Sequence, residues 1–160
     1  MSYLNQELSF DEVRWATTRK TSYDSRASFV GAPRKTLLPV STNLFRLVHL
    51  ATTLWFDGVW WMPEAVFKEL HDEVNRSAHG SGRLLRNYVA EYMALPKGDT
   101  QLCVIEIQLK TPVYGWVGQS APLMGRPGGM EQVYLPNLAQ RGDPKFSDHA
   151  RKVQSYWLKF

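Results

Sequence analysis

The sequence predicts an α+β domain with a mostly antiparallel β-sheet and flanking helices. A buried strand and helices come first and several strands follow, without the alternation of strand and helix that a parallel sheet requires. Segment 102–109 is apolar at every second position, which predicts a strand with one buried face. Segment 64–74 carries its apolar residues at helical spacing. A length of 160 residues, with 44% hydrophobic and 21% charged residues, fits one globular domain.

The first 35 residues differ in character from the rest. Ser9-Phe-Asp-Glu12 has the form of a capping box, which predicts a short helix over 10–20. Segment 21–35 is rich in Ser, Gly, Pro and charge and is typical of a loop. We therefore expect an N-terminal helix and loop extension over 1–35 and the main domain over 36–160.

The remaining elements follow from apolar runs and the breakers between them. Asp57-Gly58 predicts a turn. The C-terminal stretch from Ser147 fits either a helix or a strand, and the spacing of Ala150, Val153 and Trp157 slightly favours a helix. Gly and Pro residues predict a loop over 118–129. Further strands are expected at 42–49, 59–62, 113–117 and 131–136, and a second helix at 83–94.

Charge and cysteine content limit the possible ligands and the compartment. The net charge of +4 and the pI near 9.3 suit an anionic ligand, such as a nucleotide, nucleic acid or an acidic partner. Cys103 is the sole cysteine and the four histidines lack metal-ligand spacing, so we expect no internal disulfide and no metal. No signal peptide and no apolar run of about 20 residues is present. These features predict a cytoplasmic protein with no membrane partner, including one delivered into a target cell's cytosol.

Arg46 is the first candidate functional residue. The sequence has no phosphate-binding glycine loop and no Gly-x-Ser-x-Gly nucleophile motif. Arg46 interrupts an apolar run and, on a strand, shares a face with Leu44 and Val48. A guanidinium there must be paired or must line a cleft. Both a structural ion pair and a phosphate clamp fit this position.

Glu131 and Gln132 are the second candidates, because they follow the glycine-rich loop at the start of a short strand. Neighbours on a strand point to opposite faces. Glu131 shares a face with Val133 and Leu135, which are core-like, whereas Gln132 shares one with Tyr134. This alternation favours Gln132 as the cleft residue, unless a bulge at the preceding glycines changes the register.

Together these segments resemble the ADP-ribosyltransferase superfamily, including its NAD-glycohydrolase toxins. The resemblance covers about residues 40–137 and implies a split, mostly antiparallel sheet. The usual Ser-Thr-Ser motif of the second strand is replaced by Val59-Trp-Trp-Met62, and the catalytic Glu of transferases aligns best with Gln132. The matching segments are Leu44-Phe-Arg46, Trp60-Trp61 and Gly128-Gly-Met-Glu-Gln132-Val-Tyr-Leu-Pro136.

The resemblance implies cleavage of the nicotinamide–ribose bond of NAD, which is the substrate. Arg46 would grip the pyrophosphate, and Gln132 or Glu131 would orient the ribose hydroxyls. An amide stabilises an oxocarbenium-like charge less well than a carboxylate, so Gln132 favours hydrolysis by water. For transfer to an acceptor, Glu131 or Glu106 would supply the missing charge. The candidates to sandwich the nicotinamide are Trp60, Trp61, Phe56 and Tyr114.

Three biological roles follow as alternatives. An NAD glycohydrolase toxin would need an immunity protein or antitoxin that covers the cleft. An ADP-ribosyltransferase would need a nucleic-acid or protein acceptor, which the basic pI suits. The third reading is a non-enzymatic α+β protein-interaction module, in which the Trp residues bind a partner and Arg46 is structural.

Overall fold

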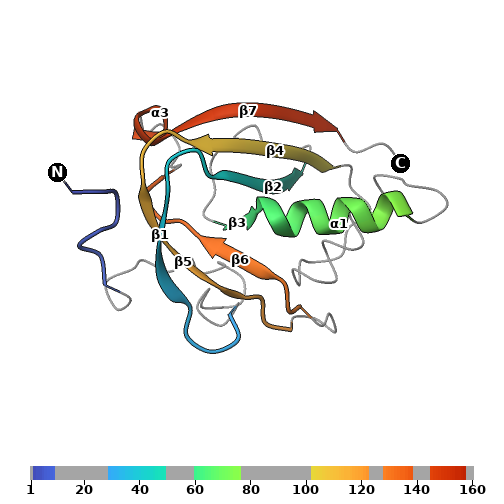
Figure 1. Ribbon diagram of the computed structural model, residues 1–160, viewed down its shortest axis with the longest axis horizontal. Coiled ribbons are helices and arrows are strands. Elements are labelled where there is room, and N and C mark those ends of the chain that lie inside the picture. Colours follow the sequence, from blue (N-terminus) through green and yellow to red (C-terminus); the bar gives the residue numbers. More distant parts are fainter. Residues whose placement is uncertain are drawn as a thin grey trace.

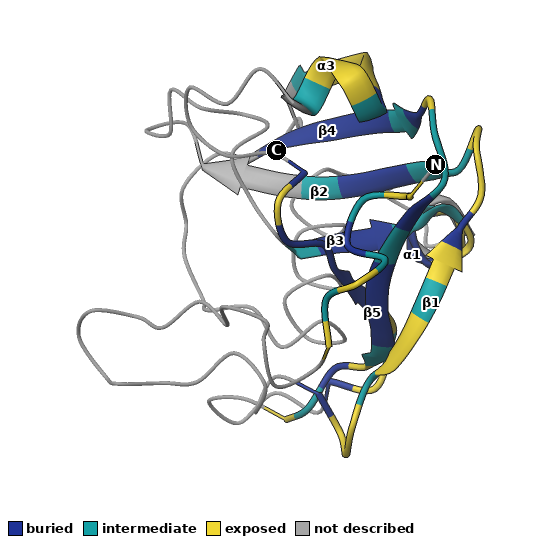
Figure 2. Ribbon diagram, turned by 90° about the vertical axis from the view of Figure 1, so that its left-hand side faces the viewer, coloured by how far each residue is buried: buried dark blue, intermediate teal, exposed yellow. Residues whose placement is uncertain are grey.

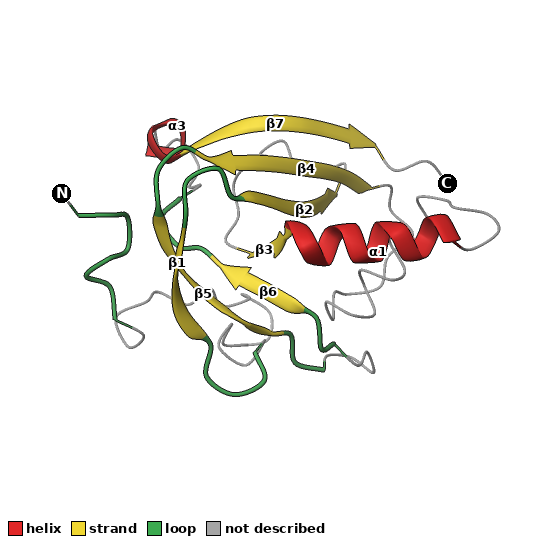
Figure 3. Ribbon diagram, in the orientation of Figure 1, coloured by secondary structure: helices red, strands yellow, loops and turns green. Residues whose placement is uncertain are grey.

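The computed structural model describes residues 2–9, 29–49, 60–76, 102–122, 128–138 and 145–157. The expected helices at 10–20 and 83–94, the turn at Asp57-Gly58 and the candidate Phe56 lie outside these residues. The elements (Figures 1 and 3) are β1 (Arg34–Leu38), β2 (Asn43–His49), β3 (Trp60–Pro63), α1 (Glu64–Arg76), β4 (Leu102–Leu109), β5 (Val113–Gln119), β6 (Glu131–Tyr134), α3 (Lys145–His149) and β7 (Ala150–Trp157).

The strands form a seven-stranded sheet in the order β1-β5-β6-β3-β2-β4-β7. Every neighbouring pair of these strands is antiparallel. β2 and β3 meet at two residue pairs, Leu44 with Pro63 and Phe45 with Met62, whereas β2 and β4 pair over the whole of β2. On either side of this short junction the strands run in different directions, with β1 and β5 crossing the line of β2, β4 and β7 (Figure 1). The α+β class and the mostly antiparallel sheet are thus confirmed, and likeness to the sheet of ADP-ribosyltransferases stays a prediction.

Alternation along β4 gives this strand one face that packs into the main core. Cys103, Ile105, Ile107 and Leu109 are each at most 1% exposed, as their shared face predicts. They pack with residues from β1, β2, β3, β5 and β6 into the main core cluster on one face, which we call the core face. Figure 2 shows β4 and β5 buried along most of their length, whereas β1 is mostly exposed.

Two expectations from the sequence need correction. Of the two alternatives left open for the C-terminal segment, the slightly favoured helix is wrong over Ala150–Trp157, which forms β7, and α3 ends just before it. Seven residue pairs with β4 stabilise it as a strand, which local apolar spacing does not reveal. β1 was not foreseen as a strand; it begins at Arg34 inside the segment expected to be a loop and pairs with β5.

α1 covers the opposite face of the sheet, beside β2 and β3. The ring of Phe67 stacks on that of Phe45, with centroids 4.3 Å apart and planes 2° apart. Val66, Phe67 and Leu70 are buried, as the helical spacing predicts. No helix among the described residues is long and apolar enough to cross a membrane.

Residues 2–9 pack against the domain through Asn5. Its amide Nδ2 donates to the carbonyls of Tyr114 (3.0 Å) and Pro136 (2.8 Å), and its Oδ1 accepts from Asn137 (3.0 Å). Lys35 Nζ donates to the carbonyl oxygens of Gln6 and Leu8. This part of the segment predicted as an extension therefore lies on β1 and β5.

We expect Cys103 to resist thiol reagents in the native protein. It is 1% exposed, and burial raises the pKa of its thiol. Access requires opening of β4, which costs several kcal/mol, so labelling at pH 8 should be at least about 1,000-fold slower than in urea-unfolded protein. The rate of iodoacetamide incorporation measures this, and equally fast labelling of both forms would contradict the burial of β4.

Candidate functional site

A cavity of about 370 Å³ lies at one end of the core face. Its walls come from β1, the turn into β2, the junction of β3 and α1, and strands β5 and β6. The charged residues in the wall are Arg34, Glu64 and Glu131. Its size falls within the range of about 300–1,000 Å³ that is usual for small-molecule sites.

The two carboxylates of the cavity differ in their surroundings. Glu64 Oε1 lies 2.6 Å from Lys68 Nζ, and this hydrogen bond raises the pKa of Lys68. Glu131 is exposed at the start of β6 and makes no ion pair with any described residue. Glu131 is therefore the carboxylate whose charge is available to a ligand in the cavity.

Arg46 and Trp61 lie on the core face, and neither of them lines the cavity itself. Their neighbours Leu44 and Val133 both line it; Leu44 is two residues from Arg46 on β2, and Val133 pairs with Trp61. The guanidinium carbon of Arg46 is 5.4 Å from the centroid of the Trp61 ring. Trp61 is 1% exposed, and its indole N–H has no hydrogen-bond acceptor among the described residues. A buried donor without an acceptor is uncommon in native proteins.

Gln132 lies on the opposite face of the sheet, beneath an aromatic cluster. It is 6% exposed and pairs with Gly118 of β5. Trp60 lies on the same face, 4.8 Å from Tyr134 and 5.3 Å from Phe29 between ring centroids. Glu131 and Gln132 therefore lie on opposite faces of the sheet, as the alternation in the sequence predicts. The described cavity, however, is on the face of Glu131.

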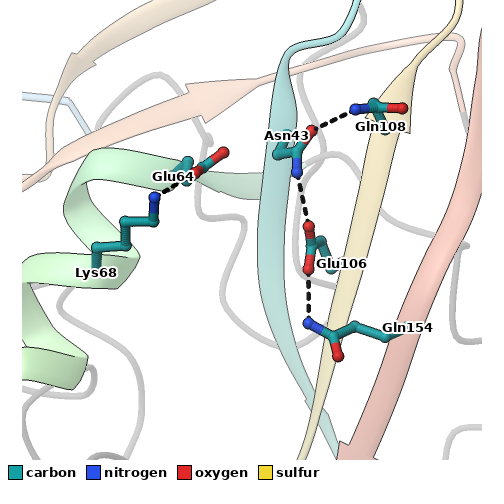
Figure 4. A network of polar contacts seen from close by, with 6 residues as sticks. All are labelled: Asn43, Glu64, Lys68, Glu106, Gln108 and Gln154. Atoms are coloured by element: carbon teal, nitrogen blue, oxygen red, sulfur yellow. Dashed lines mark hydrogen bonds and ion pairs between the residues drawn. The ribbon is translucent and has the colours of Figure 1, made fainter.

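Tyr114 and Glu106 lie apart from the cavity. Tyr114 is half-buried on the face of Gln132, where Lys35 Nζ is 5.1 Å from its ring centroid and Asn5 bonds to its carbonyl. Glu106 is buried in β4 and accepts hydrogen bonds from Asn43 and Gln154 (Figure 4). The structure therefore brings Arg46 and Trp61 together on the core face, places Glu131 in the wall of the cavity on that face, and leaves Trp60, Tyr114, Gln132 and Glu106 elsewhere.

Sequence reasoning did not single out Arg34, Glu64 or Asn43 as lining residues. Arg34 reaches the wall because β1 pairs with β5 from a distant part of the chain, with Arg34 opposite Val117. Glu64 is there because α1 begins directly after β3. The one local signal was Pro63-Glu64, a strand end followed by a helix start with a carboxylate in its first turn.

The arrangement offers donors for an anion and one carboxylate for a developing positive charge. Arg34 and Arg46 can bind phosphate oxygens, and the Trp61 indole can donate a further hydrogen bond. Glu131 can stabilise a cationic centre in the cavity. No group of three His, Cys, Asp or Glu residues that could hold a metal ion occurs within the described part of the chain.

Comparisons with known proteins give structural neighbours and no sequence relatives. No protein-family model matches the sequence, and no curated protein matches it. Tne2, solved in complex with Tni2, superposes with a TM-score of 0.52 and 17% identity over 82% of this chain and 97% of its own. Rhs1-CT, solved with its cognate immunity protein RhsI1, superposes with a TM-score of 0.51 and 12% identity over 79% of this chain and 82% of its own. At these identities the comparisons establish that the chain shares the fold of Tne2 and Rhs1-CT.

Proposed function

We propose that this chain is a toxin domain that cleaves the nicotinamide–ribose bond of NAD. The observation that carries the proposal is the fold shared with Rhs1-CT, a protein that binds a cognate immunity protein. A producer needs such a partner when the domain is harmful to it. Accordingly, we infer that this chain also has an immunity partner.

The residues on the core face support NAD as the substrate. Arg34 in the wall of the cavity and Arg46 on the same core face carry guanidinium donors that suit a pyrophosphate, which has several acceptor oxygens in a small volume. NAD also carries a cationic nicotinamide, whose departure leaves an oxocarbenium-like ribose. The chemistry thus requires anion donors and a nearby group that stabilises positive charge, and both types are present.

In the proposed reaction, the bond between the ribose C1′ and the nicotinamide nitrogen breaks, and its electron pair leaves with nicotinamide. Water adds to C1′ and loses a proton, so that the products are nicotinamide, ADP-ribose and H⁺. Glu131 stabilises the positive charge at the ribose while the bond breaks. The geometry favours Glu131 for this role over Gln132, because Glu131 lines the cavity.

We expect the purified protein to release free nicotinamide and ADP-ribose from NAD. Arg46→Lys keeps a positive charge but loses the planar fork, so KM for NAD should rise by roughly tenfold or more with the fold retained. Chromatography of the products and steady-state kinetics measure both effects. Circular dichroism checks folding.

Three other outcomes identify the alternatives. Incorporation of label from adenine-labelled NAD into protein or nucleic acid would indicate transfer instead of hydrolysis. Activity that is lost in folded Gln132→Ala but kept in Glu131→Gln would place the reacting centre on the aromatic face. Absence of both NAD turnover and NAD binding would overturn the proposal and leave a non-enzymatic interaction module.

A further inference from the structure

Glu106 is a buried carboxylate that the proposed reaction does not use. It is 6% exposed, although Glu side chains are rarely buried unless they are paired. Both of its oxygens accept hydrogen bonds from amide groups: Oε2 from Asn43 Nδ2 and Oε1 from Gln154 Nε2, each at 2.7 Å. Glu106 therefore fixes the orientation of two amides at once.

The hydrogen bonds continue beyond Glu106 in one direction. Gln108 Nε2 donates to Asn43 Oδ1 at 3.1 Å, and Arg151 Nε donates to Gln108 Oε1 at 2.7 Å. Asn43 and Gln108 each use the amide oxygen toward one neighbour and the amide nitrogen toward the other, so neither amide can flip without breaking the series. Figure 4 shows the bonds that join Gln108, Asn43, Glu106 and Gln154. This Glu106 network connects β2, β4 and the edge strand β7.

A β-bulge sets the position of Glu106 against β7. Glu106 pairs with Gln154, whereas the next residue, Ile107, pairs with Lys152, so one residue of β7 is left over. Bulges re-aim side chains and are common near functional sites. Here the bulge places Gln154 opposite Glu106.

One member of the network, Asn43, lies at the wall of the cavity. Asn43 lines the cavity together with its neighbours Thr42 and Leu44. Its side chain lies with Glu106, which pairs with Phe45 on the face covered by α1. Both polar ends of this side chain are used within the network, so Asn43 contributes shape rather than a hydrogen bond to a ligand. The side chain thus holds the beginning of β2 at the cavity.

We propose that Glu106 is a positioning residue for the cavity, which acts by holding Asn43 and the beginning of β2 in the cavity wall. The proposal rests on the proposed function for its kinetic part. A merely structural Glu106 would stabilise the sheet without influence on substrate affinity. The two roles differ in which variants change KM.

The test compares three variants that retain the size of the side chains as far as possible. Glu106→Gln places an amide donor opposite one of the two existing amide donors. Gln154→Leu removes a bond to Glu106 but leaves the Asn43–Glu106 bond in place. The double variant Asn43→Asp/Glu106→Gln reverses the direction of that bond, and each group again has a partner: Gln108 donates to residue 43, residue 106 donates to residue 43, and Gln154 donates to residue 106.

We expect Glu106→Gln to raise KM for NAD roughly tenfold with a smaller change in kcat, because a displaced wall weakens substrate binding. Gln154→Leu should keep KM within about twofold, and the double variant should restore most of the lost affinity. Equal effects of Glu106→Gln and Gln154→Leu on KM, or no recovery in the double variant, would overturn the proposal.

Amide hydrogen exchange tests the positioning role of Glu106 without any measurement of NAD cleavage. Amide exchange at residues 41–44 should accelerate in Glu106→Gln, stay as in the wild type in Gln154→Leu, and slow again in the double variant. If the wild type cleaves no NAD but this pattern holds, the proposed function fails and the positioning role stands. If exchange at residues 41–44 is unchanged in Glu106→Gln, the positioning role fails whatever the activity.

Discussion

Replacement of Glu131 by glutamine is expected to lower kcat for NAD cleavage by about 100- to 1,000-fold with little change in the free energy of unfolding. Loss of one preorganised electrostatic partner of a transition state has effects of this size. Glu131 is exposed and makes no ion pair with a described residue, so its neutralisation should change stability by less than about 0.5 kcal/mol. Steady-state kinetics and urea unfolding measure the two quantities.

Glu64→Gln is the matched control, because it removes the same charge from the same cavity. The charge of Glu64 is paired with Lys68, so its removal should reduce kcat much less than that of Glu131. Equal losses in the two variants would mean that the total negative charge of the cavity matters and that Glu131 has no special position. Wild-type kcat in Glu131→Gln would remove this residue from the proposed reaction.

Replacement of Gly128 by alanine is expected to destabilise the fold by about 2–5 kcal/mol. The φ angle of Gly128 is +64°, which costs a residue with a side chain about 1–2 kcal/mol. An added Cβ would lie 2.6 Å from the Ser120 carbonyl oxygen and 2.7 Å from that of Ala121, both backbone atoms that cannot move aside without cost. Relief of this contact would displace the bonds from Gly129 N to Ser120 that close the end of β5 and β6.

Gly31→Ala separates the cost of the positive φ angle from the cost of the steric contact. Gly31 has a φ of +69°, but nothing lies within 4 Å of the position of its Cβ. This variant should therefore lose only about 1–2 kcal/mol. Urea unfolding followed by the fluorescence of the six Trp residues measures both variants. Equal losses would show that backbone conformation alone limits position 128.

The sequence predicts best those elements whose pattern is local. The bounds of β4 were predicted correctly because alternating apolar residues and a following Thr-Pro mark them without reference to other strands. For β7 the local pattern left helix and strand open, because its stabilising partner, β4, lies more than 40 residues earlier and contributes pairings that the local pattern does not show. β1 was missed for the same reason, since its residues are mostly exposed and only β5 defines it as a strand.

The same difference between local patterns and long-range pairing applies to the candidate site. Alternation assigned Glu131 and Gln132 to their correct faces, because strand geometry depends on neighbouring residues. It favoured Gln132 as the cleft residue, whereas the described cavity lies on the face of Glu131, because that depends on how β1 and the beginning of β2 close over the core face. Arg34, more than 80 residues from its opposite residue Val117, illustrates why that information is absent from any short segment.

The order of strands has a consequence for synthesis on the ribosome. β3 has β2 on one side, but its other neighbour is β6, which is made more than 60 residues later. At translation rates of about 5–20 residues per second, one edge of β3 has no strand to pair with for about 3–15 s. A sheet built from such distant pairings also folds slowly, in milliseconds to seconds, once its parts are present. For these seconds the nascent chain exposes an unpaired strand edge that is prone to aggregate, and we expect chaperones to bind it until β6 has been made.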